Sequence, residues 1–410
     1  METPAATGLW ASGRWLTPQR MRFTAFVLLA GTLVALGYLL LTAKGTVDSF
    51  GRPVGTDFSS FWTAGRMALE GHAAAAYEWK AHWAMQKQTH GVDLFYPWSY
   101  PPVFLFVTAA LALLPYLPAY LIWQGASLAA ALAVFRAILP QPSALLYALA
   151  FPAVLVCLGH GQTGFLTAAL LGGGVLALQR HEVLAGILFG LLIYKPQFGI
   201  LLPFVLAAGG YWRAFASAAL TVVAAIGASM AIWGWPVWQA FFDSLPLTER
   251  IVFEAGDTGF EKFQSIFAWV RLWGGPLSLA YGLQALVTLP ALAACIWIWR
   301  SDAAHRLKGA ALLTAALLSS PYVLDYDLIA FGLAIALLVA HGTGHGFQPW
   351  EKTVLAIAWL SPALDRTVTG LTFIPLGFLM LAAVFLLVVR RVYVERPAGA
   401  VSAMAAAARG

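Results

Sequence analysis

Long stretches without charge restrict the fold of this sequence more than any other feature. Two of them, Leu94–Phe135 and Ala137–Gln179, contain no Asp, Glu, Lys or Arg and are separated only by Arg136. Charged residues make up 10% of the 410-residue chain, whereas a soluble domain carries about 25%. So few charges cannot cover a water-facing surface. This excludes a water-soluble enzyme, a nucleic-acid-binding module and a disordered protein.

The same stretches predict membrane-spanning helices. About 20 apolar residues cross the hydrocarbon core of a bilayer, and each uncharged stretch is long enough for one or two such spans. Inside lipid the backbone must satisfy its own hydrogen bonds, which a helix does within one segment, and the period-two alternation of a membrane β-barrel is absent. With 60% hydrophobic residues and a mean hydropathy of +0.77, the chain is predicted to be an all-α, polytopic membrane protein.

Basic residues near both ends of the chain predict its orientation, because cytoplasmic loops carry an excess of Lys and Arg. The apolar run Phe23–Thr42 follows three arginines and is long for a signal peptide, so it is interpreted as a first span with a cytoplasmic N-terminus. The run Phe373–Val389 ends in Arg390 and Arg391, which places the C-terminus on the same side. The expected organisation is a cytoplasmic N-terminal extension (1–22), one integrated membrane domain (23–390) and a cytoplasmic Ala-rich tail (391–410).

The number of spans follows from the same reasoning. The apolar segments number about 13 at the length a span requires, yet two cytoplasmic termini demand an even number of crossings. One segment therefore does not cross, and the best candidate is the short Pro101–Leu114, which has prolines at or next to both ends. We expect about 12 transmembrane helices, with this segment re-entrant or packed as a half-span.

Two stretches are too polar to lie in the membrane, about 44–100 and 234–275, and both are predicted on the extracytoplasmic side. Each combines charged residues with many Trp and Tyr side chains. Such aromatic residues are typical of helices that lie in the membrane interface. We therefore expect interfacial helices in the first extracytoplasmic loop.

An acidic residue, Asp57, lies soon after the first span. If a helix begins there, Asp57 or Thr56 caps it, and Phe58, Phe61 and Trp62 form an apolar stripe. Alternatively, Asp57 is a partly desolvated carboxylate at the membrane surface that acts as a general base on an incoming hydroxyl. The residues alone leave both interpretations open.

Other polar side chains are predicted on the same face as Asp57. Lys195 interrupts a long apolar run, and a lone charge at a span end indicates a functional contact, here with phosphate, unless it only extends to the interface. His160 lies among glycines that permit a tight turn, so it is either a ligand contact or a hydrogen-bonded structural residue. Arg66 is either a second phosphate ligand or a lipid-headgroup contact. The polar residues that share the predicted side of Lys195 and His160 are Gln162 and Gln197.

Two carboxylates, Asp325 and Asp327, lie at a further predicted span end, just after Pro321. They could bind a divalent cation, hold sugar hydroxyls, or pair with Lys195 or Arg66. No ligand cluster accompanies them, so no metal is predicted. The sequence also lacks a GxGxxG, Walker, CxxC or HExxH pattern, so we expect no cofactor and no nucleotide donor.

Five segments occur in order along the chain. They are GTDFSSFWTAGRMALEGHAAAAY (Gly55–Tyr77), YPPVFLF (Tyr100–Phe106), GHGQTGFL (Gly159–Leu166), YKPQFGILLP (Tyr194–Pro203) and SPYVLDYDL (Ser320–Leu328). Together they resemble bacterial glycosyltransferase family 87, whose members are multi-span enzymes of the GT-C superfamily. The resemblance covers roughly residues 55–365.

The resemblance implies a GT-C-type membrane fold and an inverting transferase that takes a sugar from a polyprenyl-phosphate donor. It places the reaction on the extracytoplasmic face of the bacterial cytoplasmic membrane, with Asp57 as the catalytic base. The acceptor would be a glycan or glycolipid of the cell envelope. The residues then expected at the donor phosphate or substrate are Lys195, Gln197, His160, Gln162, Arg66, Tyr100, Asp325 and Asp327.

A transporter or flippase of lipid-linked glycans is the main alternative. Such proteins carry internal repeats and place polar residues near the middle of the membrane. No repeat is visible here, and the polar residues gather on one predicted face. A structural scaffold of the cell envelope would not need Asp57, Lys195 and His160 on one side. Membrane lipid is an expected partner, and nucleic acid is not.

Overall fold

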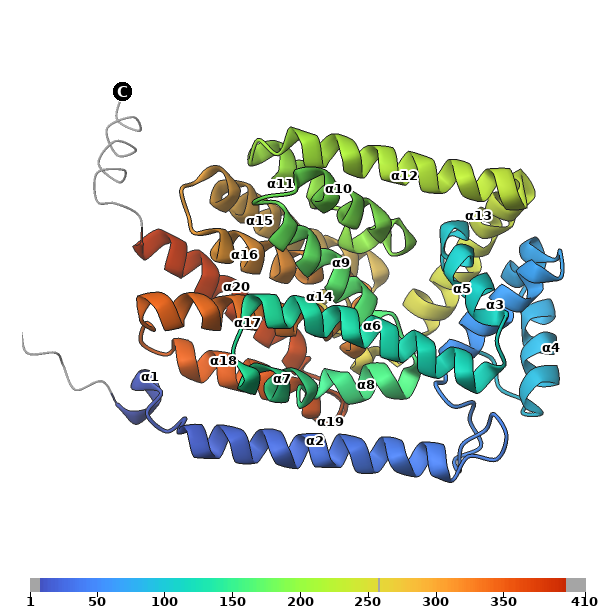
Figure 1. Cartoon of the computed structure of the whole chain (residues 1–410), viewed down its shortest axis with the longest axis horizontal. Helices are drawn as coiled ribbons and strands as arrows, with labels where there is room; N and C mark the ends of the chain where they lie inside the picture. The colour runs from blue at the N-terminus through green and yellow to red at the C-terminus, as the bar shows by residue number, and fades with distance from the viewer. Residues whose placement is uncertain (1–7, 257–258, 396–410) are drawn as a thin grey trace, which may run out of the picture.

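The computed structural model describes residues 8–256 and 259–395, and within them the regular secondary structure is helical, with only three isolated β-bridges. Figure 1 shows long helices that run side by side, with the shorter helices α3, α4 and α5 gathered at one end. The α-helices are α1 (Leu9–Ser12), α2 (Pro18–Leu41), α3 (Phe58–Leu69), α4 (Trp79–His90), α5 (Leu105–Ala112), α6 (Tyr116–Ile138), α7 (Pro142–Leu149), α8 (Ala153–His160), α9 (Gly164–Ala177), α10 (Glu182–Gly190), α11 (Leu202–Ala208), α12 (Trp212–Trp233), α13 (Trp235–Glu249), α14 (Ile266–Leu272), α15 (Leu277–Arg300), α16 (His305–Leu318), α17 (Ile329–His345), α18 (Glu351–Leu360), α19 (Asp365–Thr372) and α20 (Leu376–Val394). The short turns of 3₁₀ or π type are η1 (Ala73–Tyr77), η2 (Pro102–Phe104), η3 (Leu191–Tyr194), η4 (Pro196–Phe198), η5 (Arg250–Ala255), η6 (Phe260–Lys262), η7 (Asp325–Leu328) and η8 (Ser361–Ala363).

Six helical segments in the described chain are long and apolar enough to cross a membrane. They are α2, α6, α12, α15, the continuous segment Asp325–His345 and α20, and the bent pair of α7 and α8 adds a seventh if it is one broken span. The expected number of about 12 is therefore not confirmed. Proline is one physical reason, because it interrupts a helix: the apolar run around Lys195 divides into the shorter stretches Glu182–Tyr194 and Pro196–Ala208.

The segment Pro101–Leu114 folds as η2 and α5 and packs along α3. With 8 residues, α5 is about 12 Å long, too short to cross a bilayer alone. The expected re-entrant course is not confirmed. The helix pair bent by 59° is α7 and α8, which follow later in the chain.

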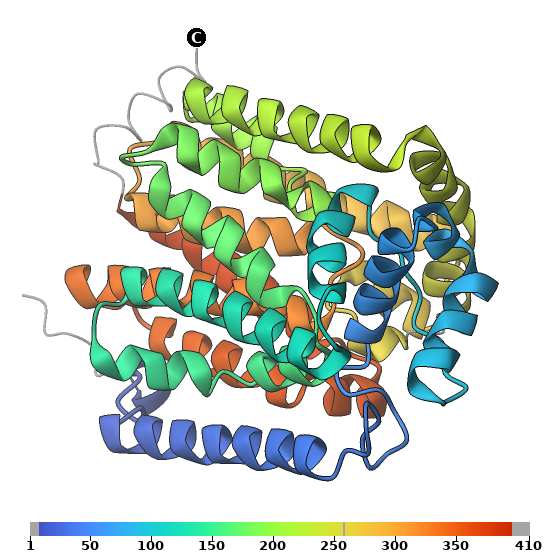
Figure 2. The same ribbon diagram turned by 45° about the vertical axis from the view of Figure 1, so that its right-hand side comes forward.

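The first polar stretch folds into α3, η1 and α4. The second contains α13, η5, η6 and α14, and it packs against the first, with the rings of Tyr77 and Phe241 5.7 Å apart. It also contacts the segment just before η7, because Gln264 N donates to Val323 O at 2.8 Å. Figure 2 shows both stretches at the same end of the molecule.

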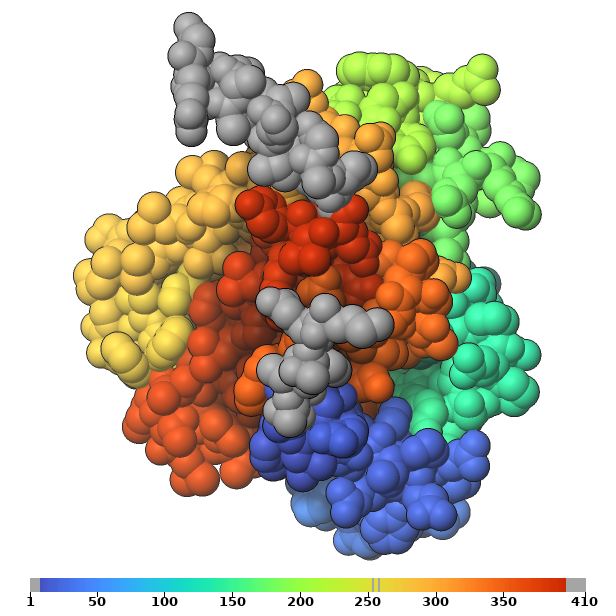
Figure 3. All heavy atoms as spheres, turned by 90° about the vertical axis from the view of Figure 1, so that its left-hand side faces the viewer, coloured from blue at the N-terminus to red at the C-terminus, as the bar shows by residue number. Residues whose placement is uncertain are grey.

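At the opposite end, α18 packs against both α1 and α20, so the first and last described helices lie near one another (Figure 3). There Trp15 Nε1 donates to Thr353 Oγ1 at 2.9 Å, and Arg391 pairs with Glu351 at 2.7 Å. Residues 1–7 of the expected N-terminal extension and 396–410 of the expected Ala-rich tail lie outside the described residues.

Burial divides the span candidates into two kinds. In the most apolar window of α2, 11% of residues are buried, and the helix lies along the outside of the molecule (Figure 1). In the window that contains α17, 78% are buried, because α6, α9, α16, α18 and α20 pack around it. The polar ends of this central helix are therefore held in one place by protein on several sides.

Candidate active site

Asp57 occupies the N-cap position of α3, but its side chain makes no capping hydrogen bond to the first turn. Its Oδ2 instead accepts a hydrogen bond from Gln162 Nε2 at 2.8 Å. The Asp57 side chain is 29% exposed, so the carboxylate is held on one side and open on the other. The helix dipole of α3 stabilises a negative charge at this place.

The turn between α8 and α9 holds Gln162 against α3. Gly161 has φ +69°, and a Cβ atom at this position would lie 2.6 Å from Phe58 Cβ, so only glycine permits the close approach of the two segments. Side chains of α6 fix the turn from behind, since Trp123 Nε1 donates to Gly161 O at 3.0 Å and Gln124 Nε2 donates to Gln162 O at 3.2 Å. The sequence pattern around His160 thus brings two distant parts of the chain into contact.

A chain of hydrogen bonds points toward the other carboxylate oxygen. An arginine only donates, so Arg366 Nη2 donates to His160 Nε2 at 2.9 Å. Because Nε2 accepts, the imidazole proton lies on Nδ1, which is 2.8 Å from Thr56 Oγ1 and donates to it. The Thr56 hydroxyl is left to donate toward Asp57 Oδ1, at 3.5 Å. The donors run in one direction, from the guanidinium to the carboxylate.

Arg366 was not among the residues expected from the sequence. It lies on α19, and its Nε donates to Asp325 Oδ2, so Asp325 joins the site through this ion pair. The guanidinium remains 38% exposed, and its Nη1 makes no hydrogen bond within the described structure. The only sequence signal was an isolated Asp-Arg pair directly before the uncharged run that begins at Thr367.

Lys195 lies between η3 and η4 and forms a buried ion pair. Its Nζ donates to Asp327 Oδ1 at 2.8 Å, and its side chain is 4% exposed. The ammonium also lies 5.0 Å from the centroid of the Tyr326 ring. In this arrangement the charge of Lys195 is neutralised within the protein, and the lysine links η4 to the N-terminal end of the central helical segment.

Tyr100 connects the aromatic cluster behind α3 to the site. Its hydroxyl donates to Gln162 Oε1 at 3.0 Å, the amide that holds Asp57. Burial raises the pKa of Tyr100 well above its usual value, with smaller effects that include the charges of Asp327 and Asp57, so the residue remains a protonated donor. Its ring lies edge-on to that of Phe61, with the centroids 5.1 Å apart.

Two expected residues do not join this network. Arg66 pairs with Glu70 at 2.7 Å on an exposed face of α3. Nine residues after Asp57 amount to about two and a half helical turns, which place Arg66 on the opposite side of the helix. Gln197 lies half-buried in η4 and makes none of the hydrogen bonds of the network.

A buried carboxylate lies next to Arg366. Among the described residues neither oxygen of Asp365 has a hydrogen-bond partner, and a Cβ added at Gly377 would meet both Asp365 Oδ2 and Gln264 Oε1. Burial and, to a smaller extent, the charge of Asp325 raise the pKa of Asp365 to about 7. In the protonated form Asp365 carries no charge, so the carboxyl and the nearby Gln264 oxygen do not place a buried negative charge beside an unpaired acceptor.

Asp57, His160 and Arg366 together provide a carboxylate, a neutral imidazole and a partly exposed cation. No group of three or more His, Cys, Asp or Glu residues among the described ones is arranged to hold a metal ion. The arrangement is suited to removing a proton from a hydroxyl beside an anionic group.

The model of one protein family, described as glycosyltransferase family 87, matches residues 98–321 of the chain. No curated protein and no solved structure gives a significant match. The matched region includes Tyr100, His160, Gln162 and Lys195, whereas Asp57 and Arg366 lie outside it.

Proposed function

Because the chain belongs to glycosyltransferase family 87, we propose that it is an inverting membrane transferase with Asp57 as its general base. It takes a sugar from a polyprenyl-phosphate donor and passes it to a glycan or glycolipid of the cell envelope. The observation that carries this proposal is the carboxylate of Asp57, which does not cap its own helix, is oriented by Gln162 and remains partly exposed.

The reaction that this geometry supports is a single displacement. The acceptor hydroxyl approaches Asp57 Oδ1 and transfers its proton to the carboxylate while its oxygen attacks the anomeric carbon of the donor sugar. The bond between that carbon and the phosphate oxygen breaks, and polyprenyl phosphate leaves with the electron pair. Attack from the face opposite the phosphate inverts the configuration.

Arg366 is the cation best placed for the donor phosphate in this proposal. The ring of His160 links it to Thr56, which is next to Asp57 in the chain. Its Nη1, which has no hydrogen bond within the described structure, and its partial exposure leave room for a phosphate oxygen. A guanidinium at this place stabilises the charge that develops on the leaving phosphate. Lys195 then acts indirectly, because its ion pair with Asp327 supports the ring of Tyr326 beneath His160.

The proposed setting is the bacterial cytoplasmic membrane. The site faces the exterior or periplasm, and residues 23–390 form one membrane domain with the preceding and following segments in the cytoplasm. The hydrophobic tail of the donor explains why an enzyme that handles sugars consists almost entirely of apolar helices. A transporter or flippase of lipid-linked glycans has no observation of its own in the described residues.

The decisive test is Asp57→Asn in a transfer assay with purified protein and a panel of polyprenyl-phosphate sugars and envelope extracts. Asn keeps the shape and can still bond to Gln162, but it cannot accept the hydroxyl proton. We expect the transfer rate to fall by about 10²–10⁴-fold, the usual contribution of a general base. Asp93→Asn, an exposed carboxylate in the same stretch, should transfer normally. Transfer by Asp57→Asn at near wild-type rate would refute the assignment of the base.

A further inference from the structure

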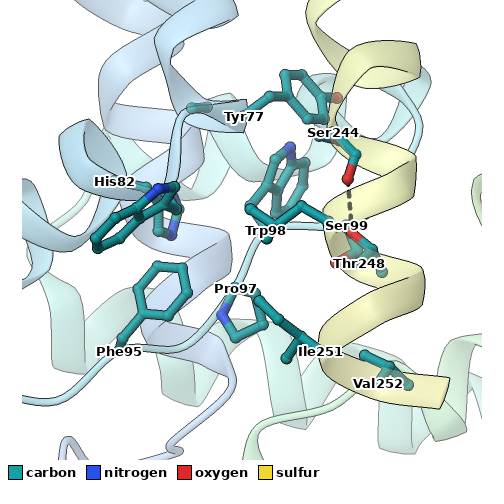
Figure 4. A pocket seen from close by; sticks show the side chains of 13 residues that line it. Tyr77, His82, Phe95, Pro97, Trp98, Ser99, Ser244, Thr248, Ile251 and Val252 are labelled. Carbon is teal, nitrogen blue, oxygen red and sulfur yellow. Dashed lines mark hydrogen bonds between the residues drawn. The ribbon is translucent and has the colours of Figure 1, made fainter. Parts of the chain in front are cut away.

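A cavity lies between the two polar stretches, beside the proposed active site. We call it the loop cavity, and its volume is about 30 Å³. Figure 4 shows His82 and Phe95 of the first stretch on one side and Ser244, Thr248 and Ile251 of the second on the other. The cavity is therefore built from both extracytoplasmic stretches and not from a single loop.

The most unusual residue of this cavity is His82. It is 1% exposed, and neither of its ring nitrogens has a full hydrogen bond to any residue that the structure describes. Burial lowers the pKa of His82 to about 3, and a hydrogen-bonding contact with the backbone of Ala76, too weak in geometry to count as a full hydrogen bond, opposes this only in part, so the ring is neutral. A neutral imidazole offers one N–H donor and one acceptor. A buried polar ring without partners costs free energy, which indicates that a ligand group completes it.

The walls and size of the cavity define what this group can be. About 30 Å³ holds one or two groups the size of a water molecule. A hydroxyl or hydroxymethyl arm fits this space, whereas a whole sugar ring does not. A hydroxyl both donates and accepts, so it can bond to either ring nitrogen of His82, but only to one at a time because the two nitrogens point in different directions. The hydroxyl oxygens of Ser244 and Thr248 donate to backbone carbonyls and keep lone pairs that can accept further hydrogen bonds.

The rim supplies an apolar surface for the rest of such a ligand. Trp79 lines the cavity and its residue is 48% exposed. The C–H face of a sugar ring carries positively polarised hydrogens, which are attracted to the negative face of an indole. A ring held against Trp79 can extend one arm inward toward His82.

The loop cavity is joined to the proposed base by a short segment. Trp98 lines the cavity, and its ring lies 5.3 Å from that of Tyr100. Tyr100 in turn bonds to Gln162, which holds Asp57. Tyr77, another residue of the cavity, donates from its hydroxyl to Tyr100 O at 2.8 Å. A glycan bound at the cavity thus contacts the same segment that orients the carboxylate.

We propose that the loop cavity is a saccharide subsite that holds the acceptor glycan, with a sugar ring on Trp79 and a hydroxyl arm bonded to His82. This inference rests on the proposed function, since it assigns the acceptor side of the same site. It predicts that acceptors carry a free hydroxyl at a sugar next to the one that is modified.

A binding experiment tests the subsite without catalysis. The full-length protein is purified in lauryldimethylamine oxide, because glucoside and maltoside detergents are themselves sugars. Saturation-transfer difference NMR then follows the ring protons of octyl β-D-glucopyranoside and octyl α-D-mannopyranoside. Octyl triethylene glycol, which has the same alkyl chain and no sugar ring, shows how much binding is hydrophobic alone.

We expect His82→Phe and Trp79→Ala each to weaken binding of at least one octyl glycoside by about tenfold, the typical effect of losing one well-placed hydrogen-bonded contact. Trp212→Ala, another exposed tryptophan on a different helix, should bind as the wild type does. Trp79→Ala keeps the test valid if His82→Phe does not fold, because Trp79 lies at the rim. Unchanged binding in both variants, or equal binding of octyl triethylene glycol, would show that the cavity holds only water and overturn the proposal.

The transfer assay separates this inference from the proposed function. In His82→Phe, the KM for an octyl glycoside that the wild type accepts should rise by about tenfold, while the KM for the polyprenyl-phosphate donor stays within about twofold. An unchanged acceptor KM alongside normal wild-type transfer contradicts the subsite only. No transfer by the wild type with any donor, together with glycoside binding that depends on His82, contradicts the proposed function only.

Discussion

A carboxylate at the start of a helix can either cap that helix or remain available for other contacts. Asp57 could satisfy the free N–H groups of α3, but the backbone oxygens of Thr56 and Asp57 accept those hydrogen bonds instead. The side chain is thereby free to bond with Gln162 and to face outward. The dipole of α3 still stabilises its negative charge, so the helix favours the proposed base while both carboxylate oxygens remain available for other contacts.

Arg366 is the residue at which the proposed donor site is tested most directly. Arg366→Gln removes the cation and the donor to His160, so we expect the transfer rate to fall by about 100-fold, as when one preorganised donor to a developing charge is lost. Arg366→Lys keeps a charge but not the fork of donors, and it should recover only part of the rate. Arg136→Gln, an exposed arginine at the end of α6, serves as the control. Normal transfer by Arg366→Gln would exclude this residue from the donor site.

Asp365 predicts a pH dependence of stability. Its pKa is raised from 3.8 to about 7 in the folded protein, so the folded state binds the proton more tightly than the unfolded state does. The contribution of Asp365 to the free energy of unfolding is therefore greatest below about pH 4. It is lost as the pH rises to about 7, by up to about 4 kcal/mol at 1.36 kcal/mol for each pH unit.

Asp365→Asn removes this dependence, because the amide is neutral at all these pH values. We expect the unfolding temperature of the wild type in detergent to decrease between pH 4 and pH 8. The variant should show a flatter curve and be the more stable of the two at pH 8. Parallel curves for the two proteins would contradict a buried, protonated Asp365.

Residues far apart in the sequence explain why only part of the site could be predicted. Asp57, His160, Lys195 and Asp325 were identifiable because each charged or polar residue stands out in an apolar chain. The pair of Lys195 with Asp327, 132 positions apart, was only one of several alternatives, and the contact of His160 with Arg366, 206 positions apart, was not predicted. In the sequence, Arg366 only marks the start of the uncharged run that begins at Thr367, which gives no reason to place it in the site. Only the path of the backbone brings it to His160.

At the scale of elements, the turn between α8 and α9 controls the position of α3. Gly161 allows Phe58 to approach from the α3 side, and Gly164 at the start of α9 touches the backbone carbonyl of Tyr326. Three separate segments therefore meet at one turn without side chains between them. A small displacement of any of them would move Asp57 relative to His160.

This contact predicts a sharp difference between neighbouring glycines. Gly161→Ala introduces a side chain at positive φ and against Phe58, so we expect a loss of about 2–4 kcal/mol in the free energy of unfolding and a larger relative loss of transfer. Gly159→Ala, two residues earlier, meets no atom within 4 Å and should be neutral or slightly stabilising. Thermal unfolding and transfer assays of the pair measure both effects. Equal stability of the two variants would contradict the tight turn.

That the apolar runs form helices was predictable from the sequence, but the lengths of those helices were not. Uncharged runs led correctly to an all-helical fold, since an apolar chain in lipid has little alternative. The same runs concealed breaks: α10 passes through η3 and η4 to α11, with Lys195 and Pro196 at the junction. The buried partner of Lys195, Asp327, stabilises this break, and hydropathy alone carries no signal of such a partner.

At the scale of the whole molecule, the proposed orientation predicts which loops are accessible from outside the cell. The chain has two cysteines, Cys157 and Cys295, and both are buried, so background labelling should be low. Asp93→Cys lies in the first polar stretch and Asp302→Cys in the loop between α15 and α16, and both positions are exposed. With a membrane-impermeant maleimide on intact spheroplasts, we expect Asp93→Cys to react at once. Asp302→Cys should react only after permeabilisation, and the reverse pattern would invert the proposed topology.

The outer position of α2 has a consequence for the order in which the molecule is assembled. As the first long apolar helix of the chain, it leaves the ribosome before its neighbours exist, and its mean hydropathy of 2.2 over 18 residues lets lipid alone stabilise it. The segment of α17 is less apolar, at 1.7, begins with two carboxylates and is synthesised after most of the helices that surround it. Lipid is thus the partner of the first helix, and earlier-made protein is the partner of the central one. Synthesis order and burial therefore match. When the acidic end of α17 is made, its partner Lys195 is already present, and its partner Arg366 follows shortly afterwards.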